Sequence, residues 1–220
     1  LNPARSQLAN RKADILATTG VHIGGTDFDR LLDLSTVMPL LGYRHIGTGN
    51  RPVPNGVFFD LSTWHLIHQA YTRKAMHFAK ELWTDFTDQA LHKRLMAALE
   101  GQYGHRMLAE VETAKIKCSI SGEDAAVHLE FLAAALAPFV TAAGMEQALQ
   151  DSIAQVVRCA QDCVTRSGLA QVDVVYLTGG SSALQPLVTA LQSAMPQATL
   201  VSGNLFGGVA AGLAYAGSCA

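Results

Sequence analysis

Three short groups of residues have the types and spacing to hold a ligand that carries phosphate and sugar. Gly24-Gly25 and Gly179-Gly180 each stand between a predicted strand and a predicted helix, and Glu112, Lys115 and Ser119 share one helix face. Glycine lets the backbone approach a ligand closely, and the start of a helix offers unpaired N–H groups to an anion. A carboxylate beside an ammonium can accept from and donate to vicinal hydroxyls. The groups therefore predict a nucleotide-like site.

Each group also has a simpler interpretation. Glycine is common wherever a parallel strand turns tightly into a helix. A Glu-Lys pair three residues apart is an ordinary feature of a solvated helix surface. The residues alone leave both interpretations open.

The C-terminal third supplies the elements that must position the second glycine pair. Residues 172–177 form a β-branched run, residues 184–195 repeat apolar side chains at helical spacing, and residues 198–201 form a second strand. With a small-residue helix at 207–216 they make a β-α-β-α unit, whose short connections predict parallel strands and a right-handed crossover. A long amphipathic helix is expected over residues 145–166.

The N-terminal part is expected to position the first glycine pair in the same way. Residues 13–17 and 21–23 have the composition of strands. Thr26, with Asp29 three residues later, predicts a helix start that resembles a capping box. Farther along, residues 125–131 alternate between apolar and polar side chains as a strand does.

These elements predict an α/β protein with one interrupted domain. Residues 1–50 and 139–220 would form a discontinuous core, and residues 51–138, which begin in a loop rich in Pro, Gly and Asn, would form an inserted α+β subdomain. A chain of 220 residues with 49% hydrophobic content can bury such a core.

Charge and composition exclude some classes of function. With 16 Lys and Arg against 18 Asp and Glu, the chain has no basic field for nucleic acid. No apolar run is long enough for a bilayer span, and the N-terminal residues lack a signal-peptide pattern, so a cytoplasmic protein is expected. The first residue, Leu1, is not Met, which indicates a fragment of a longer protein.

The cysteines and histidines show no pattern of a metal or redox site. No two cysteines form a C-x-x-C pair, and we expect them to be buried apolar side chains. We expect the scattered histidines of the middle segment to lie on solvated helix surface. These residues are Cys118, Cys159, Cys163, Cys219, His65, His68, His77, His92 and His105.

The same groups resemble motifs of the DnaK-type heat-shock chaperones, in the order in which that family has them. The resemblance is carried by residues 20–29, by Glu112-x-x-Lys115-x-x-x-Ser119, by residues 175–182, and by Asn204 with residues 208–212. The short, YegD-like branch of the family is the most similar, through residues 38–42, 176–181 and 206–214.

The resemblance implies an actin-like fold of ribonuclease-H-like lobes, with ATP or ADP and Mg²⁺ held between two lobes and ATP hydrolysed there. This chain would be the second ATPase lobe. The residues carried over by position are Gly24 and Gly25 for the phosphates, Glu112 and Lys115 for the ribose, Ser119 for the adenine edge, and Gly179 and Gly180, with Ser181 beside them, for the adenosine and phosphate contacts.

Some of the family's pattern is absent. Ala183 stands where the family has an Arg that stacks on adenine, and Phe206 stands where it has an acidic residue. No segment resembles the phosphate loops or the catalytic Lys of the first lobe, so this chain would hold no catalytic residue and would be inactive alone. Its partners would be an adenine nucleotide, the missing first lobe, and protein clients or co-chaperones.

Two other functions stay open. The chain could be a non-catalytic actin-like interaction module whose nucleotide affinity has been lost through Ala183 and Phe206. A small-molecule kinase on the same fold is a further alternative, although no substrate-orienting Asp can be identified.

Overall fold

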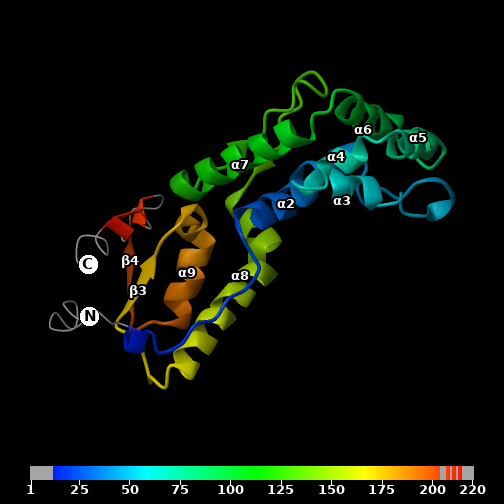
Figure 1. The fold of residues 1–220 in the computed structure, drawn as a ribbon. Coiled ribbons are helices and arrows are strands. Elements are labelled where there is room, and N and C mark those ends of the chain that lie inside the picture. The colour runs from blue at the N-terminus through cyan, green and yellow to red at the C-terminus, as the bar shows by residue number, and fades with distance from the viewer. Residues whose placement is uncertain (1–11, 204–206, 209, 212, 215–220) are drawn as a thin grey trace. The chain divides into compact units, whose positions relative to one another are not determined.

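The computed structural model describes residues 12–203 and residues 207, 208, 210, 211, 213 and 214, which mix helices with short strands (Figure 1). Residues 24–150 form one compact unit, and residues 1–23 with 151–220 form the other. We call these the helical unit and the terminal unit. The sequence-based division had instead placed residues 24–50 and 139–150 with the terminal part.

The helical unit contains most of the helices and one small sheet. Its helices are α2 (Gly25–Thr36), α3 (Gly56–Ser62), α4 (Ile67–Ala70), α5 (Arg73–Glu81), α6 (Gln89–Glu100) and α7 (Gly104–Ser121), with 3-10 turns η2 (Met38–Leu41), η3 (Thr48–Asn50) and η4 (Leu82–Thr84). Strands β1 (Ala125–Ala126) and β2 (Phe139–Val140) pair antiparallel. Helix α8 (Ala142–Arg166) begins in this unit and ends in the other.

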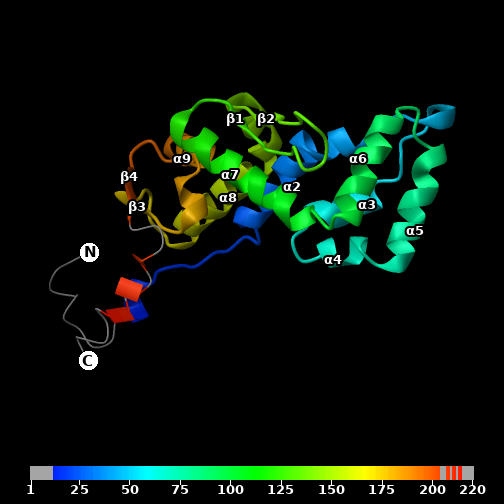
Figure 2. The ribbon, with the colours of Figure 1, turned by 90° about the horizontal axis from the view of Figure 1, so that it is seen from above.

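Helices α2 and α7 lie side by side and form the centre of the helical unit, as both views show (Figure 1, Figure 2). Beside the face that carries Glu112, α7 has an apolar stripe that packs inward: Met107, Val111 and Ala114 are fully buried. Phe28 and Leu32 are the buried apolar residues that α2 contributes to the core. This packing fixes the N-terminal end of α2 next to the middle of α7.

The strand expected over residues 125–131 is shorter than predicted. Only Ala125–Ala126 pairs as a strand, although Val127 and Leu129 still donate hydrogen bonds to carbonyls across the hairpin. The chain then turns back, since Leu132 N–H donates to the Leu129 carbonyl. Val127 and Leu129 remain fully buried. The alternation of apolar and polar residues therefore predicted the buried side correctly but overestimated the length of the strand.

The terminal unit holds a two-stranded parallel sheet. Strand β3 (Val174–Leu177) pairs in parallel with β4 (Thr199–Ser202), with Val174 opposite Thr199. The turn η5 (Gly180–Ala183) and helix α9 (Gln185–Ala194) connect the two strands. The predicted parallel pairing is therefore confirmed, whereas the helix expected at 207–216 lies partly outside the described residues.

The two strands expected near the N-terminus are wrong. Residues 12–14 form the 3-10 turn η1 (Lys12–Asp14), and residues 15–23 are extended without a strand partner among the described residues. This segment runs along α8 instead, where Thr19 Oγ1 donates to the Cys159 carbonyl at 3.0 Å. Ile15 and Leu16 are 67% and 59% exposed, so these side chains do not pack on a sheet.

Asp33 lies in the core of the helical unit, where its side chain is fully buried. Burial, the dominant cause, raises the pKa of Asp33 to about 7. The buried Ser62 hydroxyl on α3 interacts with this carboxyl group and acts to lower its pKa, but neither side chain reaches full hydrogen-bond geometry within the described structure.

The cysteines and one histidine occupy different surroundings in the two units. Cys118 is buried in the helical unit, while Cys159 and Cys163 are half-buried in the terminal unit, and all three are free thiols. His92 is buried rather than solvated, because its Nε2 bonds the Ala79 carbonyl and its ring contacts Phe86. The sequence pattern does not distinguish this buried histidine from the exposed ones.

Across the described part of the chain, no helix combines the length and the apolar composition that a bilayer span requires.

Candidate functional site

Gly24 and Gly25 form the start of helix α2. Gly24 is the N-cap in an extended conformation, and its N–H donates to Asp27 Oδ2 at 2.8 Å. The side chain that closes the helix start is therefore Asp27, and the expected role of Asp29 is wrong. Beyond the cap, the first N–H groups of a helix have no acceptor within it. Gly25 and Thr26 thus present amide donors at the α2 N-terminus.

A cavity of about 650 Å³ brings this helix start together with α7. Gly25 from α2 and Glu112 from α7 both line it, although they are far apart in the sequence. The complete lining is Gly25, Thr26, Asp29, Trp64, His105, Arg106, Leu108, Ala109 and Glu112. Two of the residues predicted to bind a nucleotide therefore line the same cavity: Gly25, expected at the phosphates, and Glu112, expected at the ribose.

Lys115 is directed into the packing between α7 and α2. Its Nζ donates to Asp29 Oδ1 at 2.6 Å, and both side chains are about nine-tenths buried. Burial raises the pKa of Asp29, and the hydrogen bond from Lys115 opposes that increase. Lys115, which was predicted to hold ribose, thus neutralises the carboxylate of Asp29. Asp29 lines the cavity, but Lys115 does not.

One side of the cavity is aromatic and cationic. Trp64, in the loop between α3 and α4, is 55% exposed, and its ring meets that of His105 edge to face at 4.7 Å. The guanidinium of Arg106 lies 4.0 Å from the centre of the Phe131 ring. The sequence gives no signal for this cluster, because only the fold brings the loop near the start of α7.

Ser119 lies on the last turns of α7, half-buried and away from the cavity. It is on the same helix as Glu112, as predicted. The third predicted contact of α7 is therefore separated from the first by two helical turns.

Gly179, Gly180 and Ser181 belong to the terminal unit. Gly179 has φ 86° and ψ 151°, a conformation that is essentially restricted to glycine. A Cβ there would meet no atom within 4 Å, so the backbone angles alone require glycine. Gly180 and Ser181 then enter the η5 turn, where Ser182 N–H and Oγ both donate to the Gly179 carbonyl.

The start of α9 is farther from the glycine pair than expected. A full 3-10 turn precedes the helix, which begins only at Gln185. The first residues of α9 are therefore Gln185 and Pro186, of which proline has no N–H, and not the residues directly after Gly180. The strand-turn-helix order is as predicted, but the glycine pair itself does not form the helix start.

The predicted site is thus divided, with Gly24, Gly25, Glu112, Lys115 and Ser119 in the helical unit and the other three residues in the terminal unit. No group of three or more His, Cys, Asp or Glu side chains in the described residues is arranged to hold a metal ion. No protein-family model matches the chain.

Proposed function

We propose that this chain is the second lobe, with an inserted α+β subdomain, of an actin-like ATPase of the DnaK type, similar to its YegD-like branch. It binds the adenosine and phosphate side of ATP or ADP, and Mg²⁺ arrives with the nucleotide. Hydrolysis needs the first lobe as partner, and the complete protein is a cytoplasmic chaperone that acts on protein clients. The observation that carries the proposal is that Gly25 and Glu112 line one cavity.

The cavity has groups for each part of a nucleotide. The amides of Gly25 and Thr26 suit phosphate oxygens, since a helix N-terminus attracts anions. The Glu112 carboxylate can accept hydrogen bonds from ribose hydroxyls. Lys115 contributes indirectly, because its ion pair removes the negative charge of Asp29 from the phosphate side.

The terminal unit supports the same function through its backbone. Its parallel β3–β4 pair, joined through η5 and α9, is a β-α-β element of the kind that α/β proteins contain, and this is compatible with the proposed lobe. The glycine-only angles of Gly179 turn the chain immediately after β3, at the carboxyl end of the sheet, where ligands of α/β proteins bind.

Isothermal titration calorimetry of the 220-residue chain with ATP·Mg²⁺ tests the proposal. Glu112→Gln should weaken binding at least ten-fold, because hydrogen bonds to a charged group contribute about 1.5–3 kcal/mol. Glu110→Gln, two residues away on the same helix and outside the cavity, is the matched control. Equal affinities of the two variants would contradict the ribose assignment.

A non-catalytic interaction module is the second candidate. The buried Lys115–Asp29 pair favours it, because the lysine is not free to bind a ligand. This candidate predicts no heat of binding with millimolar ATP·Mg²⁺ or ADP·Mg²⁺, either for this chain or after addition of a first lobe.

A further inference from the structure

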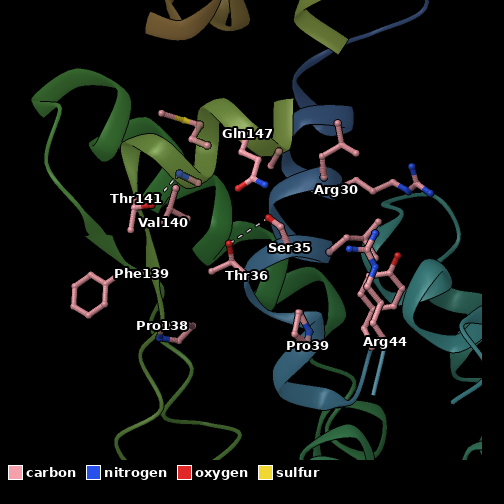
Figure 3. Close-up of a pocket in the computed structure, with 16 residues that line it drawn as sticks. Arg30, Ser35, Thr36, Pro39, Arg44, Pro138, Phe139, Val140, Thr141 and Gln147 are labelled. Atoms are coloured by element: carbon pink, nitrogen blue, oxygen red, sulfur yellow. Dashed lines mark hydrogen bonds between the residues drawn. The ribbon is translucent and has the colours of Figure 1, made fainter. Parts of the chain in front are cut away.

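A second cavity of the helical unit, an open groove of about 880 Å³, lies away from Gly25 and Glu112 (Figure 3). It runs between α2 and the 3-10 turn after it on one side and β2 with the first turns of α8 on the other. Its volume is within the range of about 300–1,000 Å³ that small-molecule sites have. The groove shares none of its lining residues with the candidate nucleotide cavity.

The groove is cationic in a chain whose net charge is negative. Arg30 and Arg44 line it, and none of the described residues along it is acidic. The whole sequence has 18 acidic against 16 basic residues, so the sign of the groove differs from that of the chain as a whole. Within the described structure, neither guanidinium forms a salt bridge. The positive charge of the groove is therefore not neutralised by the protein itself.

Arg30 is held in place by neutral groups. Its Nε donates to Thr63 Oγ1 at 3.0 Å, and its guanidinium lies 5.9 Å from the centre of the Phe59 ring. The Thr63 hydroxyl in turn donates to the Phe59 carbonyl at 2.7 Å. These contacts orient the side chain through one of its five N–H groups, which leaves the terminal fork for a ligand.

Arg44 is held by a neighbouring ring. Its guanidinium lies 5.1 Å from the centre of the Tyr43 ring, and its backbone has φ 62°. That left-handed conformation is uncommon for a residue other than Gly, Asn or Asp, and here it lies in a turn that the hydrogen bond from His45 N–H to the Gly42 carbonyl closes. Tyr43 is almost fully buried and packs edge to face on Phe59 with ring centres 5.7 Å apart.

The two arginines therefore stand on two rings that touch each other. Figure 3 shows Arg30 and Arg44 on the same side of α2. An anion that binds both guanidinium groups would offset the repulsion between their like charges. Planar guanidinium groups recognise phosphate and carboxylate through paired hydrogen bonds, so an anion with two or three oxygens fits this arrangement.

The rest of the groove suits the uncharged part of such a ligand. Hydroxyl and amide groups of Ser35, Thr36 and Gln147 lie toward its middle, where Gln147 points toward Ser35 (Figure 3). Apolar side chains, including Leu31 and the buried Met145, also line the groove and form its apolar wall. A bare inorganic anion would leave this wall and these polar groups without contacts.

We propose that this groove binds a small organic anion, a phosphate monoester or carboxylate attached to a ring or short apolar body, with Arg30 and Arg44 holding the anionic group. The site is independent of the proposed nucleotide site. It adds a second ligand to the helical unit, in a cavity that shares no lining residue with the one that contains Glu112.

The probe for this site is phenyl phosphate, titrated into the ¹⁵N-labelled 220-residue chain. We expect the side-chain amide of Gln147 and the backbone amides of Ser35 and Thr36 to shift, with millimolar affinity. Arg30→Gln and Arg44→Gln should each weaken binding at least five-fold, and the double variant should abolish it. Inorganic phosphate should bind at least three-fold more weakly, and phenol should not bind.

Arg73→Gln is the matched control, because Arg73 is an exposed arginine at the start of α5 in the same unit. It should retain the affinity of the unchanged chain within two-fold. Thermal midpoints within a few degrees of the parent establish that the variants are folded. The proposal is overturned if phenyl phosphate shifts none of the three reporters, or if Arg73→Gln weakens binding as much as Arg44→Gln does.

Discussion

Lys115 Nζ donates a hydrogen bond to Asp29 Oδ1 at 2.6 Å, inside the contact between α7 and α2. The pair joins the two helices that line the candidate nucleotide cavity. It also connects two of the three groups of residues that the sequence singled out. Asp29 follows the Gly24-Gly25 pair, and Lys115 belongs to the helix face that also carries Glu112. The lysine therefore acts on the candidate site by fixing its walls.

Lys115→Met should destabilise the helical unit by about 3–5 kcal/mol, because it leaves the Asp29 carboxylate buried without its partner. Both tryptophans, Trp64 and Trp83, belong to this unit, so their fluorescence during urea unfolding measures its stability separately. Lys117→Met, on the exposed side of the same helix, should cost less than about 0.5 kcal/mol.

The double variant Asp29→Leu, Lys115→Met completes this test. Replacing both charges by apolar groups should recover most of the loss, as in other buried ion pairs. A double variant as unstable as Lys115→Met would show that the pair does not determine the effect.

Asp33→Asn should make the stability of the helical unit less dependent on pH. The pKa of Asp33 is about 7 in the folded protein against an ordinary value of 3.8, so the folded state holds the extra proton between these values. Stability from this group is then complete below about pH 4 and decreases by about 1.4 kcal/mol per pH unit as the pH rises toward 7. Above pH 7 no further loss from Asp33 is expected.

Urea unfolding of the parent and of Asp33→Asn at pH 4 and pH 8 measures this difference. The Asp33→Asn variant should be more stable than the parent at pH 8 and should differ little from it at pH 4. An unchanged difference between the two pH values would mean that Asp33 is not the titrating group.

Gly179→Ala should destabilise the terminal unit by about 1–3 kcal/mol, because alanine cannot adopt the observed angles without strain. Gly180→Ala is the matched control, since Gly180 lies within the helical turn η5 and needs no special backbone angles. Hydrogen exchange of the Gly203 amide, which donates to the Leu177 carbonyl across the sheet, reports the effect. Equal exchange rates in the two variants would contradict the assigned conformation.

Asp27→Ala should cost the helical unit about 1 kcal/mol through loss of the bond that closes the start of α2. Thr26→Ala, at an exposed neighbouring position, should cost less. Tryptophan-monitored unfolding compares the two. If Thr26→Ala were the more destabilising change, Thr26 and not Asp27 would be the residue that caps the helix.

Periodicity predicted the elements whose buried side is continuous. The α7 stripe, the long helix α8 and the β3–α9–β4 order follow from apolar spacing, which tertiary packing does not change. The extended segment 15–23 could not be predicted, because composition does not distinguish a segment that pairs in a sheet from one that packs along a helix. The position of Asp33 has a similar cause: a helix period cannot show that a carboxylate lies on the buried side.

The candidate site was predictable in part. Glycines before a helix and a carboxylate on a helix face are local features, and the structure brings Gly25 and Glu112 together. The direction of Lys115 depends on Asp29 across the helix contact, which the sequence does not show. Arg30 and Arg44 gave no signal at all, since their common aromatic base consists of residues from two separate segments.

The separation of the thiols gives the protein a pair of built-in chemical reporters. Cys118 is closed off within the helical unit, and burial raises the pKa of its thiol, so alkylation must wait for that unit to open. Cys159 and Cys163 report on the terminal unit in the same sample. Alkylation rates of the individual cysteines, measured by mass spectrometry of peptides, would therefore show which unit a ligand protects, without any engineered label.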